Sequence, residues 1–375
     1  MRVLLSGGGT GGHINPALAI AKRILSSHPD AEIAFVGTPY GMENKLIPRE
    51  GFKLYHVDVK GFIRKPTLKN VPILYKAITS PLKAKKILKE FKPDVVIGTG
   101  GYASWPIVKA AAKAKIPTAI HEQNAVPGVT TKMLSRYVDK IMISFEESAQ
   151  FIGMPDKTVL VGNPVSPEIL TVSRESAREK YNPSGKPSIL SFGGSLGARE
   201  INNNVLEFIR EYTAKNDIIH THAVGGYEWE RRKEQVQALS DVKNAEILEY
   251  IYDMPQRMAS SDIVICRAGA ITLSELQILG KPAILIPSPN VTNNHQYKNA
   301  LVLKNHGAAE IIEEKDLSCE VLAKTVDALL CDKEKLESMK KNMLSLAIRD
   351  SGERIYEIIE KLADVKCKKE KHSKN

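Results

Sequence analysis

The chain has 375 residues, of which 43% are hydrophobic, and a formal net charge of +10. This length exceeds one typical hydrophobic core, so we expect a globular protein of two domains. No apolar stretch approaches the roughly 18 residues that a membrane-spanning helix needs, which argues against an integral membrane protein. The four cysteines are scattered without metal-type spacing. We therefore expect reduced thiols in a cytoplasmic protein, and no signal peptide because a strand pattern begins at Met1.

The positive charge is concentrated in two segments. Lys60–Lys92 contains ten basic residues and one acid, and Lys366–Asn375 contains five lysines and one glutamate. In Lys60–Lys92 the lysines alternate with apolar side chains, which favours an anionic membrane surface as partner. Nucleic acid is the competing interpretation, but stacking aromatic residues are scarce there, and a solvated helix face over an ordinary core is the third. We expect the basic tail from residue 366 to be disordered.

Strand-like apolar runs alternate with helical stretches along the whole chain, which predicts α/β domains with parallel sheets. Turn residues in "VLVGNPVSPE" (159–168) indicate a domain boundary, and from about Glu334 the pattern is helical to Ala363. In the first half we expect strands at Val3–Leu5, Ile33–Val36, Lys53–Val59, Val95–Thr99, Thr118–His121 and Lys140–Ile143.

The first strand is followed by "GGGTGGH", residues 7–13, and then by a helical pattern over Ile14–Leu25. Glycines let a ligand approach the backbone, and a helix N-terminus favours an anion, so this loop predicts an anion site; a tight turn without ligand is the alternative. Gly7, Gly9 and Gly12 also satisfy the dinucleotide pattern G-x-G-x-x-G. His13 lies beside the predicted site, where a general base would be placed.

Similar polar loops follow other predicted strands: "GTGGYAS" (98–104), "HEQN" (121–124), "GGSLGA" (193–198) and "RAGAITLSE" (267–275). Because ligands of open α/β sheets bind beyond the carboxyl ends of the strands, we expect these loops to form the site. Ser195 would add a hydroxyl to a phosphate cradle, and Glu275 would accept bonds from a ribose. Glu122 is either a base, or a residue that orients Asn124 or caps a turn.

No Asp-x-Asp pair occurs in the chain, so a metal that bridges a diphosphate has no obvious ligands. The charge on a departing diphosphate would then be stabilised by backbone amides and helix N-termini. We accordingly expect neither a metal nor another cofactor.

Taken in order, "GGGTGGH", "GTGGYAS", "HEQN", "GNPV", "GGSLGA", "RAGAITLSE" and "NHQYKNA" resemble the bacterial peptidoglycan N-acetylglucosaminyltransferase family, commonly called MurG. The resemblance implies a GT-B fold: two Rossmann-like, doubly wound domains that face a cleft. It implies an acceptor-binding, membrane-facing domain over 1–163 and a UDP-GlcNAc-binding domain over 164–345. A C-terminal helix over 346–365 would pack on the first domain, before the tail 366–375.

The resemblance also implies the reaction. An inverting glycosyltransferase would move GlcNAc from UDP-GlcNAc to the 4-hydroxyl of MurNAc in undecaprenyl-diphosphate-MurNAc-pentapeptide, without a metal. The enzyme would be a peripheral protein at the cytoplasmic face of the cell membrane, with Lys60–Lys92 on the lipid and no nucleic acid partner.

Site residues carry over motif by motif. His13 is the leading catalytic base and Glu122 the alternative, and Ser166 stands where many family members carry a donor-contacting arginine. The backbone of Ile251 would read the uracil, Glu275 the ribose, and Gln296 the GlcNAc. The other expected donor contacts are Thr10, Gly11, Gly12, Asn124, Ser195, Ala270, Ile271 and Thr272, and the expected acceptor contacts are Gly100, Gly101, Tyr102 and Ser104.

Other functions fit less well. A nicotinamide oxidoreductase would place an acid at the end of the second strand, but "AFVGTPYG" offers none before Glu43. A sugar-nucleotide epimerase or a glycolipid synthase would use the same architecture for a different reaction. A non-enzymatic binder of membranes or nucleic acid would explain the charge but not the loops.

Overall fold

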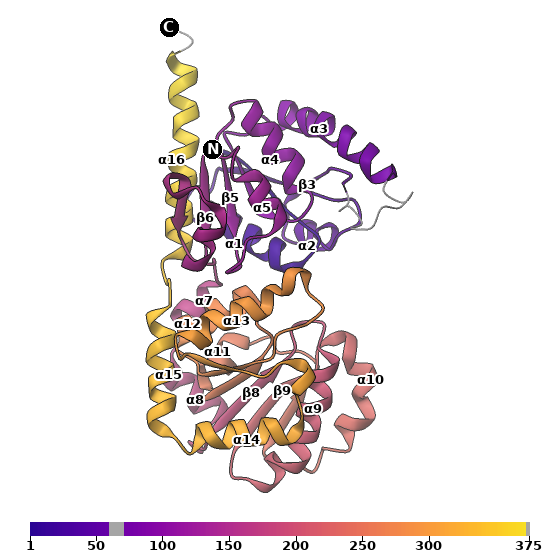
Figure 1. Ribbon diagram of the computed structural model, residues 1–375, viewed down its shortest axis with the longest axis vertical. Helices are drawn as coiled ribbons and strands as arrows, with labels where there is room; N and C mark the ends of the chain where they lie inside the picture. Colours follow the sequence, from indigo (N-terminus) through magenta and orange to yellow (C-terminus); the bar gives the residue numbers. More distant parts are fainter. Residues whose placement is uncertain (60–70, 373–375) are drawn as a thin grey trace. The chain divides into compact units, whose positions relative to one another are not determined.

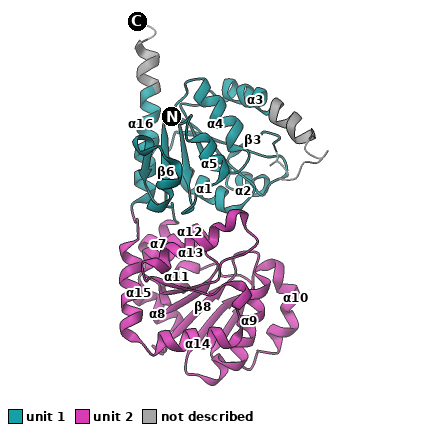
Figure 2. Ribbon diagram, viewed as in Figure 1, with its two compact units in different colours: residues 1–165, 350–375 teal, residues 166–349 magenta. Residues whose placement is uncertain are grey.

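The computed structural model describes residues 1–59 and 71–372, with the backbone alone for 71–79 and 366–372. These residues form two compact units (Figure 2): Met1–Val165 with Asp350–Asn375 is unit 1, and Ser166–Arg349 is unit 2. Each unit is built around its own sheet of parallel strands, and each is described by itself below.

Unit 1 contains a seven-stranded sheet in the order β3-β2-β1-β4-β5-β6-β7. Figure 1 labels β3, β5 and β6 of these strands, together with helices of the same unit. Strand order reverses between β1 and β4, which is where open α/β sheets place their ligands. The strands are β1 (Arg2–Gly7), β2 (Glu32–Gly37), β3 (Lys53–His56), β4 (Val95–Gly100), β5 (Thr118–Glu122), β6 (Lys140–Ile143) and β7 (Thr158–Leu160). The helices are α1 (Gly11–Ser27), α2 (Glu43–Arg49), α3 (Val71–Phe91), α4 (Ser104–Lys113), α5 (Val129–Leu134), α6 (Ala149–Ile152) and α16 (Ser351–His372).

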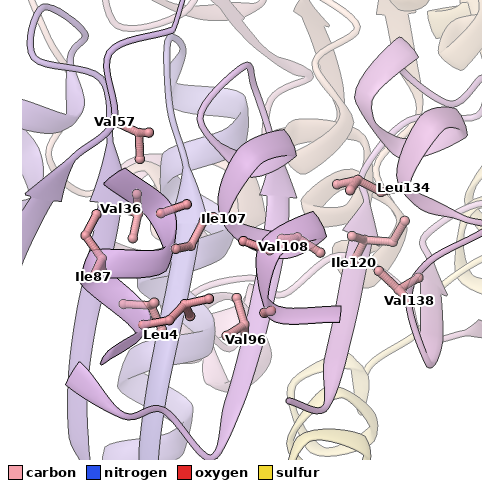
Figure 3. Close-up of a cluster of buried hydrophobic side chains, with 14 of the residues drawn as sticks. Leu4, Val36, Val57, Ile87, Val96, Ile107, Val108, Ile120, Leu134 and Val138 are labelled. Carbon is pink, nitrogen blue, oxygen red and sulfur yellow. The ribbon is translucent and has the colours of Figure 1, made fainter. Parts of the chain in front are cut away.

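Alternation along the strands gives this sheet two apolar faces. Leu4 faces a cluster with α3 and α4 that includes Ile87 and Ile107 (Figure 3), whereas Val3 and Leu5 face α1 and α16. These side chains are nearly inaccessible to water, and burying one of this kind contributes about 1.5–3 kcal/mol. Strong burial on both faces fixes the position of the strand ends that carry the polar loops.

Helix α16 is the last element of the chain but packs on α1 in unit 1. Arg23 on α1 forms an ion pair with Glu353, and its guanidinium lies 4.7 Å from the centroid of the Tyr356 ring. Apolar residues of α16, among them Ile355 and Ile359, complete the core on this face.

Unit 2 repeats the architecture with a six-stranded sheet in the order β10-β9-β8-β11-β12-β13, which reverses between β8 and β11. The strands are β8 (Ser188–Phe192), β9 (Ile219–Ala223), β10 (Ala245–Leu248), β11 (Ile263–Cys266), β12 (Ala283–Leu285) and β13 (Ala309–Ile311). The helices are α7 (Pro167–Thr171), α8 (Arg174–Tyr181), α9 (Arg199–Glu211), α10 (Gly226–Gln237), α11 (Met254–Ser260), α12 (Ala270–Leu279), α13 (His295–Asn305), α14 (Cys319–Leu330) and α15 (Lys333–Ser345).

The expected fold class, two Rossmann-like parallel α/β units of the GT-B type, is confirmed. Several boundaries differ from expectation. Helix α1 begins at Gly11 rather than Ile14, since glycines with poor helix propensity form its first turn. Helix α16 continues to His372, so the tail that we expected to be disordered from residue 366 is helical to that point. Within the described residues, no helix is both long and apolar enough to cross a bilayer.

Candidate active site

The loop Gly7–Gly12 carries the expected base at its end. Gly9 has φ +86°, a left-handed conformation that favours glycine, and α1 begins two residues later. His13 lies in the first turn of α1, and its Nδ1 lies 3.1 Å from the carbonyl oxygen of Gly8 and 3.4 Å from Thr10 Oγ1. A carbonyl oxygen only accepts, so the shorter contact indicates that Nδ1 carries a proton and that the lone pair of the neutral ring is on Nε2.

The loop after β4 packs directly on this first loop. Thr99 donates from Oγ1 to the carbonyl oxygen of His13 at 2.7 Å. A Cβ on Gly100 would lie 2.6 Å from His13 Cδ2, and one on Gly101 would lie 2.4 Å from the carbonyl oxygen of Gly8. Glycine at these two positions is therefore explained by packing inside the protein. Tyr102, next to them, is 61% exposed and remains a candidate for contact with a ligand.

Ser104 does not fit the expected contact with an acceptor. Its side chain is fully buried, and its Oγ lies 2.7 Å from the carbonyl oxygens of both Ser6 and Gly100. The hydroxyl thus holds the two glycine loops together at the ends of β1 and β4. We correct the expectation: Ser104 is a structural residue of this site.

The hydrogen bonds of Glu122 decide between its two expected roles, a catalytic base and a residue that orients Asn124. Its buried carboxylate accepts hydrogen bonds from Asn124 N and Nδ2 at 3.1 Å, from Gly128 N at 3.0 Å and from Thr131 Oγ1 at 2.6 Å. These donors occupy both oxygens and fix the loop that carries Asn124. The geometry argues against a catalytic base and supports the alternative, that Glu122 orients Asn124.

Glu43 is a site residue that the sequence motifs did not reveal. It begins α2, yet its carboxylate is fully buried and accepts a hydrogen bond from Gly9 N at 2.9 Å. The same carboxylate accepts from Thr38 N and Oγ1. The only hint in the sequence is the pair of glycines shortly before it, Gly37 and Gly41, which make room for the side chain.

In unit 2, the loop Gly193–Ala198 leads from β8 into α9. Gly194, Ser195 and Leu196 are exposed, and a Cβ on Gly194 would meet no atom within 4 Å. A cavity of about 460 Å³ borders this loop and is also lined by Arg267, Ser288 and Gln296. The cavity therefore joins two expected site segments, the glycine loop and Gln296, within one unit.

Two polar side chains of this cavity are held in place by unit 2 itself. Gln296 accepts from Ser288 N at 2.9 Å through Oε1, so the orientation of its amide is fixed. Arg267, to which we had assigned no role, donates to the carbonyl oxygen of Ile286 at 3.1 Å and forms an ion pair with Glu314. Its place directly after β11, at the reversal of strand order, is the signal that could have indicated it.

Helix α12 carries the expected acidic contact. Ala270, Ile271 and Thr272 form its first turn after Gly269, and Glu275 follows in the next turn. Glu275 is half-buried, and burial raises the pKa of its carboxyl to about 7. No hydrogen bond of this carboxylate is found among the described residues, which suits a group that accepts from a ligand.

The remaining expected donor contacts are distributed over both units. Ile251 is buried in the loop after β10, between the exposed Tyr250 and Tyr252. Ser166 is the first residue of unit 2 and precedes α7. Thr10, Gly11, Gly12 and Asn124 belong to unit 1, so the expected donor contacts are divided between the units. Over residues 1–59 and 71–372, no group of three metal-ligating side chains is found.

Comparison with known proteins identifies the family. Residues 3–143 match the glycosyltransferase family 28 N-terminal domain, and residues 188–362 match the glycosyltransferase family 28 C-terminal domain. A relative from Acetivibrio thermocellus is 46% identical over 96% of this chain and 97% of its own length. That relative is named UDP-N-acetylglucosamine–N-acetylmuramyl-(pentapeptide) pyrophosphoryl-undecaprenol N-acetylglucosamine transferase.

Comparison with solved structures leads to the same family. The crystal structure of MurG from Acinetobacter baumannii covers 96% of this chain, and 99% of that protein is covered, with a TM-score of 0.77 and 28% identity. A UDP-GlcNAc 2-epimerase from Neisseria meningitidis, bound to UDP-GlcNAc, covers 96% of this chain and is covered completely (100%), with a TM-score of 0.64. Its 18% identity supports a shared fold alone. The chain therefore belongs to glycosyltransferase family 28 and, within it, to the MurG family of N-acetylglucosaminyltransferases.

Proposed function

We propose that this enzyme transfers GlcNAc from UDP-GlcNAc to the 4-hydroxyl of MurNAc in undecaprenyl-diphosphate-MurNAc-pentapeptide, with inversion at the anomeric carbon. The substrates are those in the name of the Acetivibrio thermocellus relative, which is similar over 96% of this chain. The observation in the structure that carries the proposal is His13, whose Nδ1 contact with the Gly8 carbonyl leaves Nε2 as the basic nitrogen.

Unit 2 would hold the donor. The exposed amides of the loop Gly193–Ala198 and the Ser195 hydroxyl would bind the diphosphate, together with the first turn of α12. Glu275 would accept from the ribose hydroxyls, and the backbone of Ile251 would bind the uracil edge. Gln296, with its Oε1 engaged by Ser288 N, would offer its amide N–H groups to the GlcNAc hydroxyls.

Unit 1 would hold the acceptor and the base. His13 Nε2 would take the proton of the MurNAc 4-hydroxyl as that oxygen attacks the anomeric carbon of the donor. The bond from the anomeric carbon to the diphosphate oxygen breaks, and UDP leaves with its charge stabilised by amide donors. Tyr102 would position the acceptor, whereas Asn124 and the backbone of Thr10–Gly12 would contact the donor, as the resemblance implies.

A basic surface on α3 supports a peripheral place at the cytoplasmic face of an anionic membrane. Within the described part, Lys83, Lys85, Lys86 and Lys89 are exposed, and Leu82 is 68% exposed beside them. The expected contact residues from 60 to 70 lie outside the described residues, as do the side chains of 71–79. Each lysine near an anionic surface contributes about 1 kcal/mol, so replacing Lys83, Lys85 and Lys86 by glutamate should strongly weaken binding to anionic liposomes. If the variant sedimented with anionic liposomes as the wild type does, α3 would not be the membrane-binding surface.

The reaction is tested by UDP release from UDP-GlcNAc, with and without a short-chain lipid-diphosphate-MurNAc-pentapeptide, in the presence of EDTA. We expect release that depends on the acceptor and survives EDTA, and a disaccharide product in the mass spectrum. Conversion of the donor into another sugar nucleotide without acceptor would instead support an epimerase on the same fold. Release that needs a divalent metal would contradict charge stabilisation by amides.

A further inference from the structure

Glu43 is a buried carboxylate with no place in the reaction as proposed above. Its side chain is fully inaccessible to water, and three donors from two segments point at it. Gly9 N donates to Oε2 at 2.9 Å, while Thr38 N and Oγ1 donate to Oε1 at 2.7 and 2.8 Å. A buried carboxylate is costly unless it is hydrogen-bonded, and these three donors satisfy this one.

The surrounding backbone is shaped for this carboxylate. A Cβ on Gly8, Gly37 or Gly41 would lie 2.6, 2.5 or 2.0 Å from atoms of the Glu43 side chain. Burial by itself would raise the pKa of Glu43, but the hydrogen bonds from Gly9 and Thr38 outweigh it and hold the pKa below its usual value. The group is therefore an anion enclosed by the protein, at the loop that ends in His13.

One peptide unit connects this anion to the imidazole. The N–H of the Gly8–Gly9 peptide donates to Glu43, and the C=O of the same peptide lies 3.1 Å from His13 Nδ1. A trans peptide directs its N–H and C=O to opposite sides, so the carboxylate and the imidazole lie on opposite sides of one amide. A hydrogen bond to a charged acceptor polarises the amide and strengthens its oxygen as an acceptor.

We propose that Glu43 is a positioning residue that acts on His13 through the Gly8–Gly9 peptide and holds the imidazole in the Nδ1–H tautomer. The carboxylate fixes the plane of the peptide, and the Gly8 carbonyl then accepts from Nδ1–H. Nε2 keeps the lone pair, as a base needs. The catalytic consequence rests on the proposed role of His13, whereas the tautomer is a property of the protein without substrate.

The tautomer is tested first, in the wild-type chain without ligand, from the ¹⁵N chemical shifts of the two His13 ring nitrogens. We expect a protonated Nδ1 and an unprotonated Nε2 in the neutral ring. An Nε2–H ring would overturn the proposal, whatever the enzyme's activity. This measurement needs no variant, so it stands even if changes at Glu43 prevent folding.

The second arm changes Glu43. Glutamine has a single carbonyl oxygen, so Glu43→Gln cannot accept from both Gly9 and Thr38, and Glu43→Asp keeps the charge but is one methylene too short. We expect both variants to populate a mixture of tautomers. Thr38→Val leaves the Gly9 contact in place and should keep the wild-type tautomer, as should Glu50→Gln, which only breaks a surface ion pair with Lys22. A wild-type tautomer in Glu43→Gln would overturn the proposal.

The third arm separates positioning from general stabilisation. We expect Glu43→Gln to lower kcat by about 10- to 100-fold, the loss typical when a residue that orients a functional side chain is removed, with KM for UDP-GlcNAc unchanged. In a His13→Ala background the same change should lower kcat no further, since its effect passes through His13. Equal losses in both backgrounds would identify a structural clamp only. If His13→Ala itself keeps full activity, the proposed base fails, while the ¹⁵N shifts still decide the tautomer.

Discussion

The glycine loops after β1 and after β8 follow equivalent strands of the two units but have different surroundings. In unit 1, the loop Gly7–Gly12 is engaged by the protein's own groups: Glu43 accepts from Gly9 N, and the loop after β4 packs against Gly8. In unit 2, Gly194 and Ser195 of the loop Gly193–Ala198 are exposed, and Gly193, Gly197 and Ala198 line a cavity of about 460 Å³. The loop after β1 thus holds a histidine through the protein's own groups, whereas residues of the loop after β8 stay exposed, as the anion site that we propose there requires.

This difference shows what a glycine-rich loop after a strand does and does not predict. Amides at the start of a helix favour an anion in both units. Whether that anion is a ligand depends on side chains that come from elsewhere in the fold. In unit 1 the anion at Gly9 is Glu43, from a different helix, and only the folded chain brings it there.

The strongest test of the first loop as a mount is removal of its histidine. His13→Ala should lower kcat by about 10²- to 10⁴-fold, the usual contribution of a general base, and leave the affinity for UDP-GlcNAc nearly unchanged. Steady-state kinetics and a UDP binding titration measure the two effects separately. Near-full kcat in this variant would show that His13 is not the catalytic base. The loop after β1 would then have no catalytic role to compare with that of the loop after β8.

The sheet of unit 2 holds two buried histidines on β9. Ser191 Oγ lies 2.8 Å from both His220 Nε2 and His222 Nδ1. Burial lowers the pKa of His220, and it lowers the pKa of His222 to about 4. The unfolded chain then binds more protons than the folded one between pH 6.5 and 4, so stability present above pH 6.5 is lost as the pH falls. Each histidine should cost up to about 2 kcal/mol between pH 6.5 and 5.

Tryptophan fluorescence can follow the two units separately, because Trp105 lies on α4 in unit 1 and Trp229 on α10 in unit 2. In single-tryptophan variants, urea unfolding of unit 2 at pH 5 and 7 gives the change of its unfolding free energy with pH, which is the slope that the buried histidines determine. His222→Gln should flatten that slope, and Glu275→Gln serves as the background because Glu275 titrates with the opposite sign. An unchanged slope in His222→Gln would show that this histidine is not held neutral.

Glu275 predicts a conflict between stability and donor binding. Since the folded pKa of about 7 lies above the unfolded value, folded-state stability declines as the pH rises from 4.5 through 7. Glu275→Gln should therefore stabilise the protein at pH 8 by about 1–3 kcal/mol and weaken UDP-GlcNAc binding by about tenfold. Wild-type affinity should rise with pH through 7, because a ribose hydroxyl donates to the ionised form. Affinity in Glu275→Gln should not change over this range.

Thermal unfolding and titration calorimetry at pH 6 and 8 provide both readouts for Glu275. A variant that is less stable at pH 8, or one that binds the donor as the wild type does, would contradict the assignment of this carboxylate to the open site.

The smallest effect is expected at Ser104. Ser104→Ala removes a hydroxyl within 2.7 Å of two backbone carbonyls and should cost about 1 kcal/mol of unfolding free energy. The KM for the acceptor should stay within about twofold, because the buried side chain cannot reach a ligand. A large rise in that KM with unchanged stability would restore Ser104 as an acceptor contact.

The sequence predicted the fold class and the main strands because strand periodicity and glycine loops are local signals. It also placed His13, Ser195 and Glu275 in the segments that follow strands. It did not predict Glu43, Arg267 or Glu314, since each acts through a contact with a distant segment, such as Gly9 or Ile286. For a related reason it assigned Ser104 to the acceptor and left Glu122 open between a base and a residue that orients Asn124. A polar residue in a loop after a strand can either bind a ligand or hold the loop in place. Only its burial and its hydrogen-bond partners, which need the structure, distinguish the two roles.

The most direct test of the comparison between the loops is hydrogen exchange, followed by mass spectrometry, with and without UDP. We predict that UDP protects amides in Gly193–Ala198 and in the first turns of α12, while Gly7–Gly12 exchanges at the same rate with and without UDP. Protection centred on Gly7–Gly12, with none at Gly193–Ala198, would contradict this prediction. The first loop would then bind the diphosphate, and Glu43 would compete with it for the Gly9 amide.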